Sequence, residues 1–338
     1  MIIESIAPLR LGLAGGGSDV SPFSEIYGGC VLNATIDLKA FCRIEELPDE
    51  KIVVESSDAG ISCERPLGAM LDSGAILVDG VYNRIVRQFG PVAGGFRITT
   101  GNDAPAGSGL GTSSTMVVCI LSCFLRWMDI DLDRHSLASL AYEIERKDLG
   151  LAGGKQDQYA AAFGGFNFME FGTDGAVTVS PLDISPEVRQ ALESSMVLYF
   201  TGRSRSSAAI ISEQQKNTSS GNRTAIDAML RIKQSALEMK EALLGGDMAR
   251  FSRILGSAWE DKKKMAGAIT NETIQQAFDT AISSGAESGK VSGAGGGGFM
   301  MLVAAHGRRS ELESALAQLP GTLVPFRFTD NGVQSWKR

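Results

Sequence analysis

The stretch that most constrains this chain is Pro105-Ala-Gly-Ser-Gly-Leu-Gly-Thr-Ser-Ser114, in which three glycines precede a run of hydroxyl residues. Glycine allows the backbone to turn with positive φ and to approach a ligand closely. Residues 116–125 are apolar enough to form a buried helix. Free backbone N–H groups and the helix dipole at such a helix start favour an anion. The segment therefore predicts a phosphate-binding loop, with a glycine turn capped by Ser or Thr as the alternative.

A second glycine cluster, at residues 293–298, follows Lys290-Val-Ser and runs directly into the apolar, strand-like residues 299–303. Its glycines satisfy the pattern G-x-G-x-x-G, but a dinucleotide-binding turn should open a helix, and the sequence signals none here. The Gly-Lys pair near the first loop, Gly154-Lys155, is followed by Gln156, so it does not form a Walker loop. We predict that the second cluster is a glycine turn packed against the first loop.

A third glycine-rich segment, residues 7–19, contains Pro8-Leu-Arg10 and ends in Gly15-Gly-Gly-Ser-Asp19. With the other two clusters it resembles the three motifs of the GHMP kinases, the superfamily of galactokinase, homoserine kinase, mevalonate kinase and phosphomevalonate kinase. The motifs occur in the family's order and span residues 7 to about 303, so the resemblance covers nearly the whole chain. Residues 9–19 and 152–167 are most similar to the D-glycero-D-manno-heptose 7-phosphate kinases, whereas the Gly-Glu-His-Thr-Asp of galactokinases is absent.

The resemblance implies an α+β chain with the two-domain GHMP kinase fold, and 338 residues exceed the usual size of one domain. It implies a nucleotide-binding α/β domain over residues 1–185, similar to domain 2 of ribosomal protein S5, and a ferredoxin-like α/β domain over residues 186–338. The active site would lie in the cleft between them. Residues 203–222, rich in Ser, Gln and Asn, are expected to form a mobile segment beside this site. Apolar periodicity predicts strands near residues 2–6, 34–44, 51–55, 96–100, 164–170, 176–179 and 196–200, and helices near 78–89, 113–128 and after Asp133.

Composition indicates a globular enzyme rather than a nucleic-acid-binding or membrane protein. The 32 basic and 39 acidic residues give a formal charge of −7, and no basic block offers a surface for nucleic acid or anionic lipid. The longest apolar run, around residues 115–125, is too short to cross a bilayer, and no leader pattern opens the sequence. Five scattered cysteines indicate buried thiols in a reducing compartment. We expect a cytoplasmic protein with small-molecule partners, and no periodicity indicates its oligomeric state.

The resemblance implies ATP as the phosphate donor and Mg²⁺ as the metal, because phosphoryl transfer needs neutralisation of the phosphate charge. It assigns the ATP phosphates to the first loop, with the second glycine cluster closing over them. The residues assigned in this way are Pro105, Gly107, Ser108, Gly109, Leu110, Gly111, Thr112, Ser113, Ser114, Gly295 and Gly296.

Glu145 and Ser113 are the metal ligands that the resemblance implies. Glu145 lies twelve residues before Asp157, the separation at which galactokinases place a magnesium-directed Glu. One carboxylate and one hydroxyl suffice beside the nucleotide phosphates, because Mg²⁺ keeps several waters. Glu143, on a different face of a helix, is the alternative ligand. An exposed ion pair with a neighbouring basic residue is the competing interpretation for either glutamate.

Asp157 matches the family's Asp that faces the acceptor hydroxyl, where it would act as a general base. Its alternative role is to cap the helix that follows. Arg10 matches the position at which the family places a cation near the substrate and the transferring phosphate, and a guanidinium suits phosphate oxygens. Asp19, together with Gly16 and Gly17, would bind sugar hydroxyls, with a capping Asp after a glycine turn as the alternative.

A phosphate carried by the substrate has three candidate sites. These are Arg203 with Arg205, then Lys155, and finally residues 259–264. Two arginines beside several hydroxyls after a strand are typical of a phosphate-binding turn. For each candidate, a solvated surface charge is an equally good interpretation.

The sequence thus predicts an ATP-dependent kinase that phosphorylates the anomeric hydroxyl of a sugar phosphate. The substrate that the resemblance implies is D-glycero-D-manno-heptose 7-phosphate, and the product is the 1,7-bisphosphate. One alternative is a GHMP sugar kinase acting on fucose or a related hexose, and another is a catalytically silent binding protein of the GHMP fold. The presence of Arg10, Ser113, Glu145 and Asp157 together argues against a silent protein.

Overall fold

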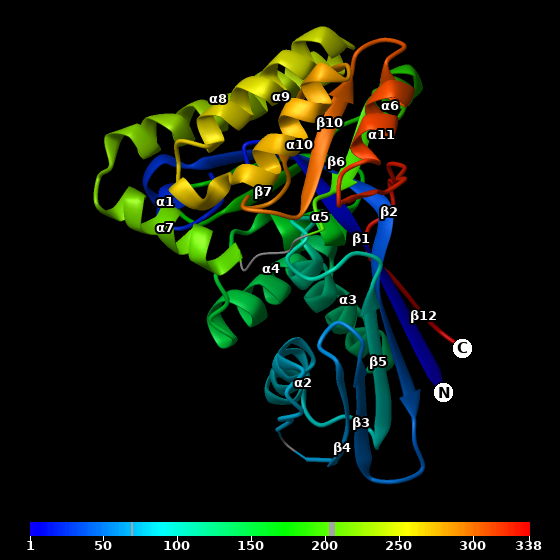
Figure 1. Cartoon of the computed structure of the whole chain (residues 1–338). Helices are drawn as coiled ribbons and strands as arrows, with labels where there is room; N and C mark the ends of the chain where they lie inside the picture. The colour runs from blue at the N-terminus through cyan, green and yellow to red at the C-terminus, as the bar shows by residue number, and fades with distance from the viewer. Residues whose placement is uncertain (69, 203–206) are drawn as a thin grey trace.

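The computed structural model describes residues 1–68, 70–202 and 207–338, which form two β-sheets with helices packed on them (Figure 1). The eight-stranded sheet has the order β12-β1-β2-β5-β3-β4, and β6 pairs with β2 and with β7. The pairing of β3 with β5 is parallel, and the other pairings in this sheet are antiparallel. Its strands are β1 (Ile2–Ala14), β2 (Gly29–Glu46), β3 (Lys51–Ser56), β4 (Ile61–Pro66), β5 (Phe96–Asn102), β6 (Phe166–Phe171), β7 (Val177–Pro181) and β12 (Gln334–Lys337).

The four-stranded sheet has the order β11-β8-β10-β9 and is antiparallel. Its strands are β8 (Met196–Phe200), β9 (Ala286–Val291), β10 (Phe299–Ala304) and β11 (Thr322–Leu323). The helices are α1 (Phe23–Tyr27), α2 (Ile76–Phe89), α3 (Thr112–Trp127), α4 (Arg134–Tyr142), the π-helix η1 (Glu143–Asp148), α5 (Gln156–Phe163), α6 (Pro186–Ser195), α7 (Ser207–Ser219), α8 (Arg223–Leu244), α9 (Met248–Lys262), the 3₁₀ turn η2 (Gly267–Ile269), α10 (Glu272–Ser283) and α11 (Arg309–Leu316).

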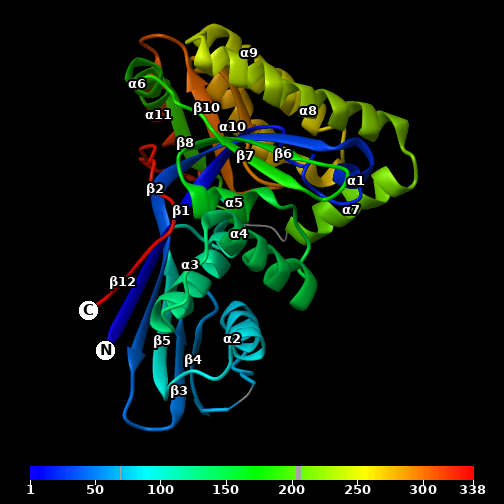
Figure 2. The same cartoon turned by 180° about the vertical axis from the view of Figure 1, so that it is seen from behind.

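The long strands β1 and β2 connect the two parts of the molecule. They run from the part that holds β3, β4, β5 and α2 into the part covered by α8 and α9 (Figure 1). Seen from behind, α3 and α5 lie against the same two strands (Figure 2). Residues 114–125 of α3 are buried on every side, because β1 and β2 pack on one face and α2 on another. A helix that is apolar all round belongs in such a place.

Strand β12 joins the end of the chain to its beginning. It pairs antiparallel with β1, with Ile3 opposite Lys337 and Ile6 opposite Gln334. The backbones of Ile2 and Arg338 exchange hydrogen bonds of 3.1 and 2.8 Å. The last residues of the expected second domain therefore lie on the eight-stranded sheet, and the division at residue 185 stays a prediction.

The elements predicted from periodicity are present, including the paired strands β6 and β7 and the helix α4, whose N-terminus is capped by Asp133. The sequence did not predict α7, which occupies residues 207–219 of the segment expected to be mobile. Ser and Asn lower helix propensity, but Ile210, Ile211 and Gln214 are buried, and this tertiary packing stabilises the helix. No helix in the described ranges is both long and apolar enough to span a membrane.

Candidate active site

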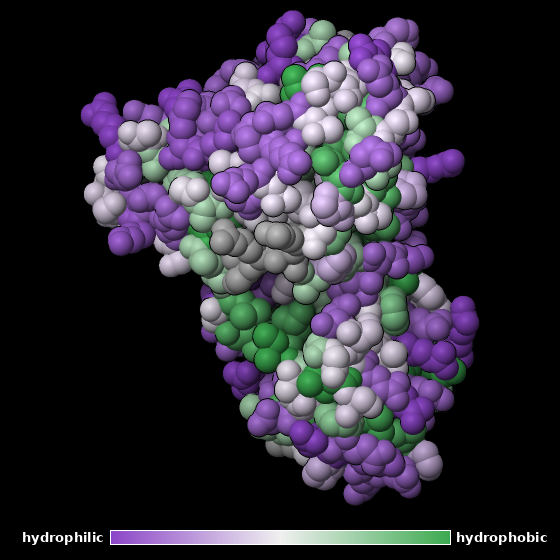
Figure 3. All heavy atoms as spheres, viewed as in Figure 1, coloured by the Kyte–Doolittle hydropathy of each residue, from purple (hydrophilic) through white to green (hydrophobic). Residues whose placement is uncertain are grey.

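A cavity of about 280 Å³ opens where the loop after β1, the first glycine loop, the start of α5 and the end of α9 meet. On the face shown in Figure 3, a hollow lined with apolar side chains separates the two parts of the molecule. The walls of the cavity include Arg10, Asp19, Ser113, Glu145 and Asp157. The fold therefore brings together residues from β1, the loop after it, α3, η1 and α5.

The first glycine loop leads into α3 as the phosphate-loop interpretation requires. Gly107, Gly109 and Gly111 have φ of 73°, 83° and 79°, values that other residues rarely adopt. Gly111 is the N-cap residue of α3, and no side chain caps the helix among the residues described. The N–H groups of the first turn are therefore left for a ligand, as at other anion-binding helix starts. Of the residues assigned to ATP, the cavity is lined by Gly107, Gly109, Gly111, Thr112, Ser113 and Ser114, whereas Pro105, Ser108 and Leu110 support the loop from outside it.

The second glycine cluster packs against the first loop, which confirms that prediction. The N–H of Phe299 donates to the carbonyl oxygen of Ser108 at 2.9 Å. A Cβ atom on Gly293 would lie 2.6 Å from Cα of Gly109, and one on Gly298 would lie 2.3 Å from the oxygen of Ser108. Any larger residue would push the two loops apart.

The glycines of this cluster that were assigned to ATP lie elsewhere. The N–H of Gly296 donates to Ile269 at 2.7 Å, and a Cβ atom on Gly295 would lie 2.9 Å from the Ile269 oxygen. Gly293 and Ala294 line the cavity instead. The tight turn directs Gly295 and Gly296 toward η2, and their assignment to ATP stays a prediction.

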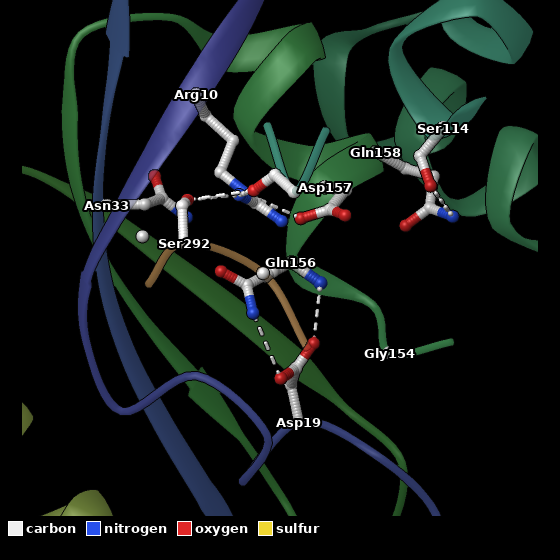
Figure 4. Close-up of polar contacts among 12 residues, drawn as sticks. Arg10, Asp19, Asn33, Ser114, Gly154, Gln156, Asp157, Gln158 and Ser292 are labelled. Carbon is white, nitrogen blue, oxygen red and sulfur yellow. Dashed lines mark hydrogen bonds and ion pairs between the residues drawn. The ribbon is translucent and has the colours of Figure 1, made fainter. Parts of the chain in front are cut away.

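Arg10 and Asp157, 147 positions apart, form an ion pair in the cavity wall (Figure 4). Arg10 Nε donates to Asp157 Oδ1 at 2.7 Å, and Arg10 Nη1 donates to the carbonyl oxygen of Gly109 at 2.6 Å. Asp157 does not cap α5, which has Lys155 as its N-cap residue without a capping side chain. Asp157 Oδ2 has no hydrogen-bond partner among the residues described, so one carboxylate oxygen is available to a ligand.

Asp19 holds the start of α5, the helix that carries Asp157. Its carboxylate accepts hydrogen bonds from the backbone N–H groups of Lys155 (2.9 Å) and Gln156 (3.1 Å), from Gln156 Nε2 (3.1 Å) and from the N–H of Gly17 (3.2 Å). Figure 4 shows Gln156 between Asp19 and the Arg10–Asp157 pair. A Cβ atom on Gly154 would lie 1.9 Å from Asp19 Oδ2. The alternative role of Asp19, a helix cap, is therefore present, and the same side chain lines the cavity.

Glu145 is buried beside the first loop, with 1% of its surface exposed. Ser113 Oγ donates to Glu145 Oε1 at 2.8 Å, and Gln158 Nε2 donates to Oε2 at 2.7 Å. Arg146 Nη1 lies 3.1 Å from Oε1. π-Helical turns such as η1 are frequent at functional sites, and this one directs Glu145 inward. Ser113 and Glu145 are thus adjacent oxygen donors at the start of α3.

Glu143 belongs to a different environment. Its carboxylate pairs with Arg84 and, at 3.1 Å, with Lys147, and 37% of its side chain is exposed. Glu143 therefore forms the exposed ion pair that was the competing interpretation, and Glu145 lines the cavity. In the described ranges no group of three or more His, Cys, Asp and Glu residues could hold a metal on its own.

The predicted sites for a substrate phosphate have different outcomes. Lys155 is not brought to the cavity, because its Nζ lies 3.4 Å from the oxygen of Gly175 and 5.7 Å from the centre of the Tyr142 ring. Arg203 and Arg205 lie outside the described residues. Within residues 259–264, Lys262 reaches the cavity.

The sequence did not single out Lys290, a second lysine in the cavity wall. Its Nζ donates to the carbonyl oxygen of Gly12 at 2.8 Å, and Lys262 Nζ donates to the oxygen of Gly293. Burial, followed by repulsion from Arg10, lowers the pKa of Lys262 to about 8. Burial, followed by Lys262 and Arg10, lowers the pKa of Lys290 well below its usual value. The only signal in the sequence was that Lys290 lies three positions before the second glycine cluster.

Comparison with known proteins agrees with the geometry. The family model described as GHMP kinases N terminal domain matches residues 76–165, and GHMP kinases C terminal matches residues 239–321. A D-glycero-alpha-D-manno-heptose 7-phosphate kinase of Campylobacter jejuni is 43% identical over 337 residues, which cover 99% of each chain. The chain belongs to the GHMP kinase family. As a GHMP kinase it is a phosphotransferase that uses ATP and a hydroxyl acceptor, and its two sheets form the GHMP kinase fold.

Two further relatives place the chain within this family. A solved structure described as a D-glycero-D-manno-heptose 1-phosphate kinase from Bacteroides thetaiotaomicron is 50% identical, covers 99% of each chain and has a TM-score of 0.85. An L-fucokinase/L-fucose-1-P guanylyltransferase of Bacteroides fragilis is 26% identical over 90% of this chain and 34% of its own length. The similarity to the heptose phosphate kinases is therefore greater than that to the fucokinase.

Proposed function

We propose that this GHMP kinase transfers the γ-phosphate of ATP to the anomeric hydroxyl of D-glycero-D-manno-heptose 7-phosphate, giving the 1,7-bisphosphate. Two relatives above 40% identity are named as kinases of a heptose phosphate. The observation that carries the proposal is the Arg10–Asp157 pair, which lies against the phosphate loop and leaves one carboxylate oxygen without a partner in the described part of the chain. The five unpaired cysteines are in keeping with action in a reducing cytoplasm.

Asp157 is the group we assign to the acceptor hydroxyl. Its Oδ2 would accept the hydrogen bond from that hydroxyl and take its proton as the oxygen attacks phosphorus. Arg10 fixes the orientation of the carboxylate through Oδ1 and ties it to the loop through Gly109. The guanidinium then lies where charge accumulates on the transferring phosphate.

Asp19 and the glycines beside it are assigned to the sugar. Each oxygen of the Asp19 carboxylate accepts two hydrogen bonds, three of the four from Lys155 and Gln156 and one, the longest at 3.2 Å, from the N–H of Gly17. A sugar hydroxyl would replace the Gly17 N–H as a donor to Oδ1. Gly16 and Gly17 line the cavity next to it. Small residues there leave room for a sugar ring between Asp19 and Asp157.

Glu145 and Ser113 fit a magnesium ion, because they place a carboxylate and a hydroxyl oxygen 2.8 Å apart at the start of the phosphate loop helix. A bound Mg²⁺ neutralises charge on the nucleotide phosphates. Gln158 and Arg146 hold the Glu145 carboxylate in place for this role.

We predict that Glu145→Gln raises the Mg²⁺ concentration for half-maximal rate by roughly an order of magnitude, because an amide is a weaker ligand than a carboxylate. The matched control is Glu143→Gln, two residues away and in an exposed ion pair, which should leave this concentration unchanged. Ser113→Ala should resemble a milder Glu145→Gln, since water can replace the hydroxyl. Titration of the initial rate with Mg²⁺ measures this concentration for all three variants. If only Glu143→Gln raised it, the metal ligand would be Glu143 and not Glu145.

The function is tested by coupled ADP release with a panel of acceptors. We expect the highest kcat/KM for D-glycero-D-manno-heptose 7-phosphate, and ³¹P NMR of the product should show a new phosphate on the anomeric carbon. A higher kcat/KM for unphosphorylated heptose, fucose or galactose would overturn the substrate assignment and leave a general sugar kinase. Absence of ADP release with every sugar would indicate a silent binding protein.

A further inference from the structure

Two lysines of the cavity wall have no role in the reaction as described so far. Lys262 ends α9 and Lys290 lies in β9, and each is only 4% exposed although both line the cavity. With Arg10 they place three cationic side chains on one side of the cavity. Ser113, at the start of α3, and Glu145, in η1, lie in a different part of the wall.

The partners of these lysines are neutral. Lys290 Nζ donates to the carbonyl oxygens of Gly12 (2.8 Å) and Leu13 (3.3 Å), and Lys262 Nζ donates to that of Gly293. In the described part of the chain neither ammonium forms an ion pair. Each can donate three hydrogen bonds, so donors remain on both.

The carboxylates of the cavity are engaged elsewhere. Asp157 pairs with Arg10, Asp19 accepts from the start of α5, and Glu145 accepts from Ser113 and Gln158. They do not neutralise the two ammonium groups at hydrogen-bond distance.

The electrostatic cost of this arrangement is visible in the pKa values. Burial is the main cause that lowers the pKa of Lys262 to about 8, followed by repulsion from Arg10, with Asp19 acting in the opposite direction. Burial, Lys262 and Arg10 together lower the pKa of Lys290. Buried charges without a charged partner destabilise a protein. Such groups are typical of sites where a ligand of opposite charge binds.

Gln156 adds an acceptor to the cavity wall near Gly12, whose oxygen binds Lys290. Its Oε1 is buried and has no hydrogen-bond partner among the residues described. The atom lies 3.7 Å from where a Cβ on Gly12 would stand, and the oxygen of Gly12 binds Lys290. A ligand there meets ammonium donors for an anion and an amide oxygen for a hydroxyl.

We propose that Lys262 and Lys290, with Arg10, form a phosphate-binding subsite on the side of the cavity built by α9 and β9. This inference rests on the proposed function, in which two phosphates enter the same cavity. One is carried by the sugar and the other is the γ-phosphate of ATP. The shared ligand is a phosphate dianion, and the experiment distinguishes its source.

The variants are Lys262→Met and Lys290→Met, which keep the aliphatic stem and remove the charge. The matched control is Lys264→Met, because Lys264 lies two residues beyond Lys262, is half exposed and pairs with Asp261 at 3.0 Å. Lys262→Gln keeps a donor for the Gly293 oxygen and replaces Lys262→Met if that variant does not fold.

The first measurement is the Tm shift caused by inorganic phosphate at constant ionic strength. We expect phosphate to raise the Tm of wild type and of Lys264→Met by the same amount. In Lys262→Met and Lys290→Met most of this rise in Tm should be absent. If the shift persists at saturating AMP-PNP with Mg²⁺, the subsite takes the phosphate of the sugar. If AMP-PNP abolishes the shift, the subsite takes the γ-phosphate.

The Tm of the free protein separates a ligand role from a structural one. A subsite that lacks its anion is strained by repulsion, so Lys262→Met should have a Tm at or above that of wild type without ligand. A lower Tm, with the phosphate shift intact, would mean that Lys262 only supports the Gly293 turn and would overturn the proposal.

Steady-state kinetics give an independent readout. Loss of charge-assisted hydrogen bonds should raise KM for the sugar phosphate by roughly 10- to 100-fold in Lys262→Met if the sugar is the source, with little change for the unphosphorylated sugar. If ATP is the source, KM for ATP should rise with every sugar. Unchanged KM values and an unchanged phosphate shift in both methionine variants would refute the subsite. A preference of wild type for plain sugars would refute the proposed substrate only, because the phosphate shift does not depend on turnover.

Discussion

Replacing Asp157 by asparagine should lower kcat by roughly two to four orders of magnitude while leaving the affinity for ATP within a few-fold of wild type. Asparagine keeps the shape of the side chain, and its amide oxygen can still accept from Arg10 Nε. It loses the basicity at the second oxygen, which in wild type has no partner among the described residues. Coupled ADP release gives kcat, and calorimetric titration with AMP-PNP gives the nucleotide affinity.

Asp131→Asn is the matched control for this experiment. Asp131 is exposed and lies in the loop before α4, outside the cavity lining. The kcat of Asp131→Asn should therefore equal that of wild type. If the kcat of Asp157→Asn lay within a few-fold of that of wild type, Asp157 would not be the general base, and its role would be to orient Arg10.

Replacing Gly154 by alanine should raise KM for the sugar by roughly 10-fold or more and lower Tm by about 2–5 °C. The added Cβ would stand 1.9 Å from Asp19 Oδ2, closer than any real contact, so the carboxylate must move. Asp19 would then lose its hydrogen bonds to Lys155 and Gln156, and the start of α5 would lose its cap. Because α5 carries Asp157, kcat should fall as well.

Gly16→Ala provides the comparison within the same cavity. A Cβ at Gly16 would have Gln156 Nε2 as its nearest neighbour at 3.7 Å, an ordinary contact, so Tm should stay near that of wild type. Thermal unfolding and the KM for the sugar measure both variants. Equal behaviour of the two alanine variants would show that Asp19 tolerates displacement.

The local features of the site could be predicted from the sequence because they depend on local chemistry. The pattern of glycines at 107, 109 and 111 followed by an apolar run predicts a tight loop at the start of a buried helix. The structure contains this loop. The choice of Glu145 over Glu143 was harder, since it depends on η1. A π-helical turn changes which side chain points inward, and short sequences do not reveal it.

Long-range contacts could not be predicted in the same way. Asp19 reaches α5 across 136 residues, and no spacing rule indicates that its carboxylate binds backbone N–H groups there. Lys290 enters the cavity because β9 ends beside Gly12, a neighbour set only by the tertiary fold. The helix α7 depends on tertiary contacts in the same way, because Ile210 and Ile211 are buried by elements distant in the sequence.

The pairing of β12 with β1 has a consequence for how the protein is made. On the ribosome β1 emerges early and its four-residue partner emerges more than 300 residues later. Until then the outer edge of β1 offers unpaired N–H and C=O groups, which can recruit strands of other chains. A nascent chain can therefore already contain both glycine loops and every proposed catalytic residue while one edge of its larger sheet is still open. Closure of that edge must wait for the synthesis of β12, so the edge stays open to strands of other chains while everything between β1 and β12 is being made.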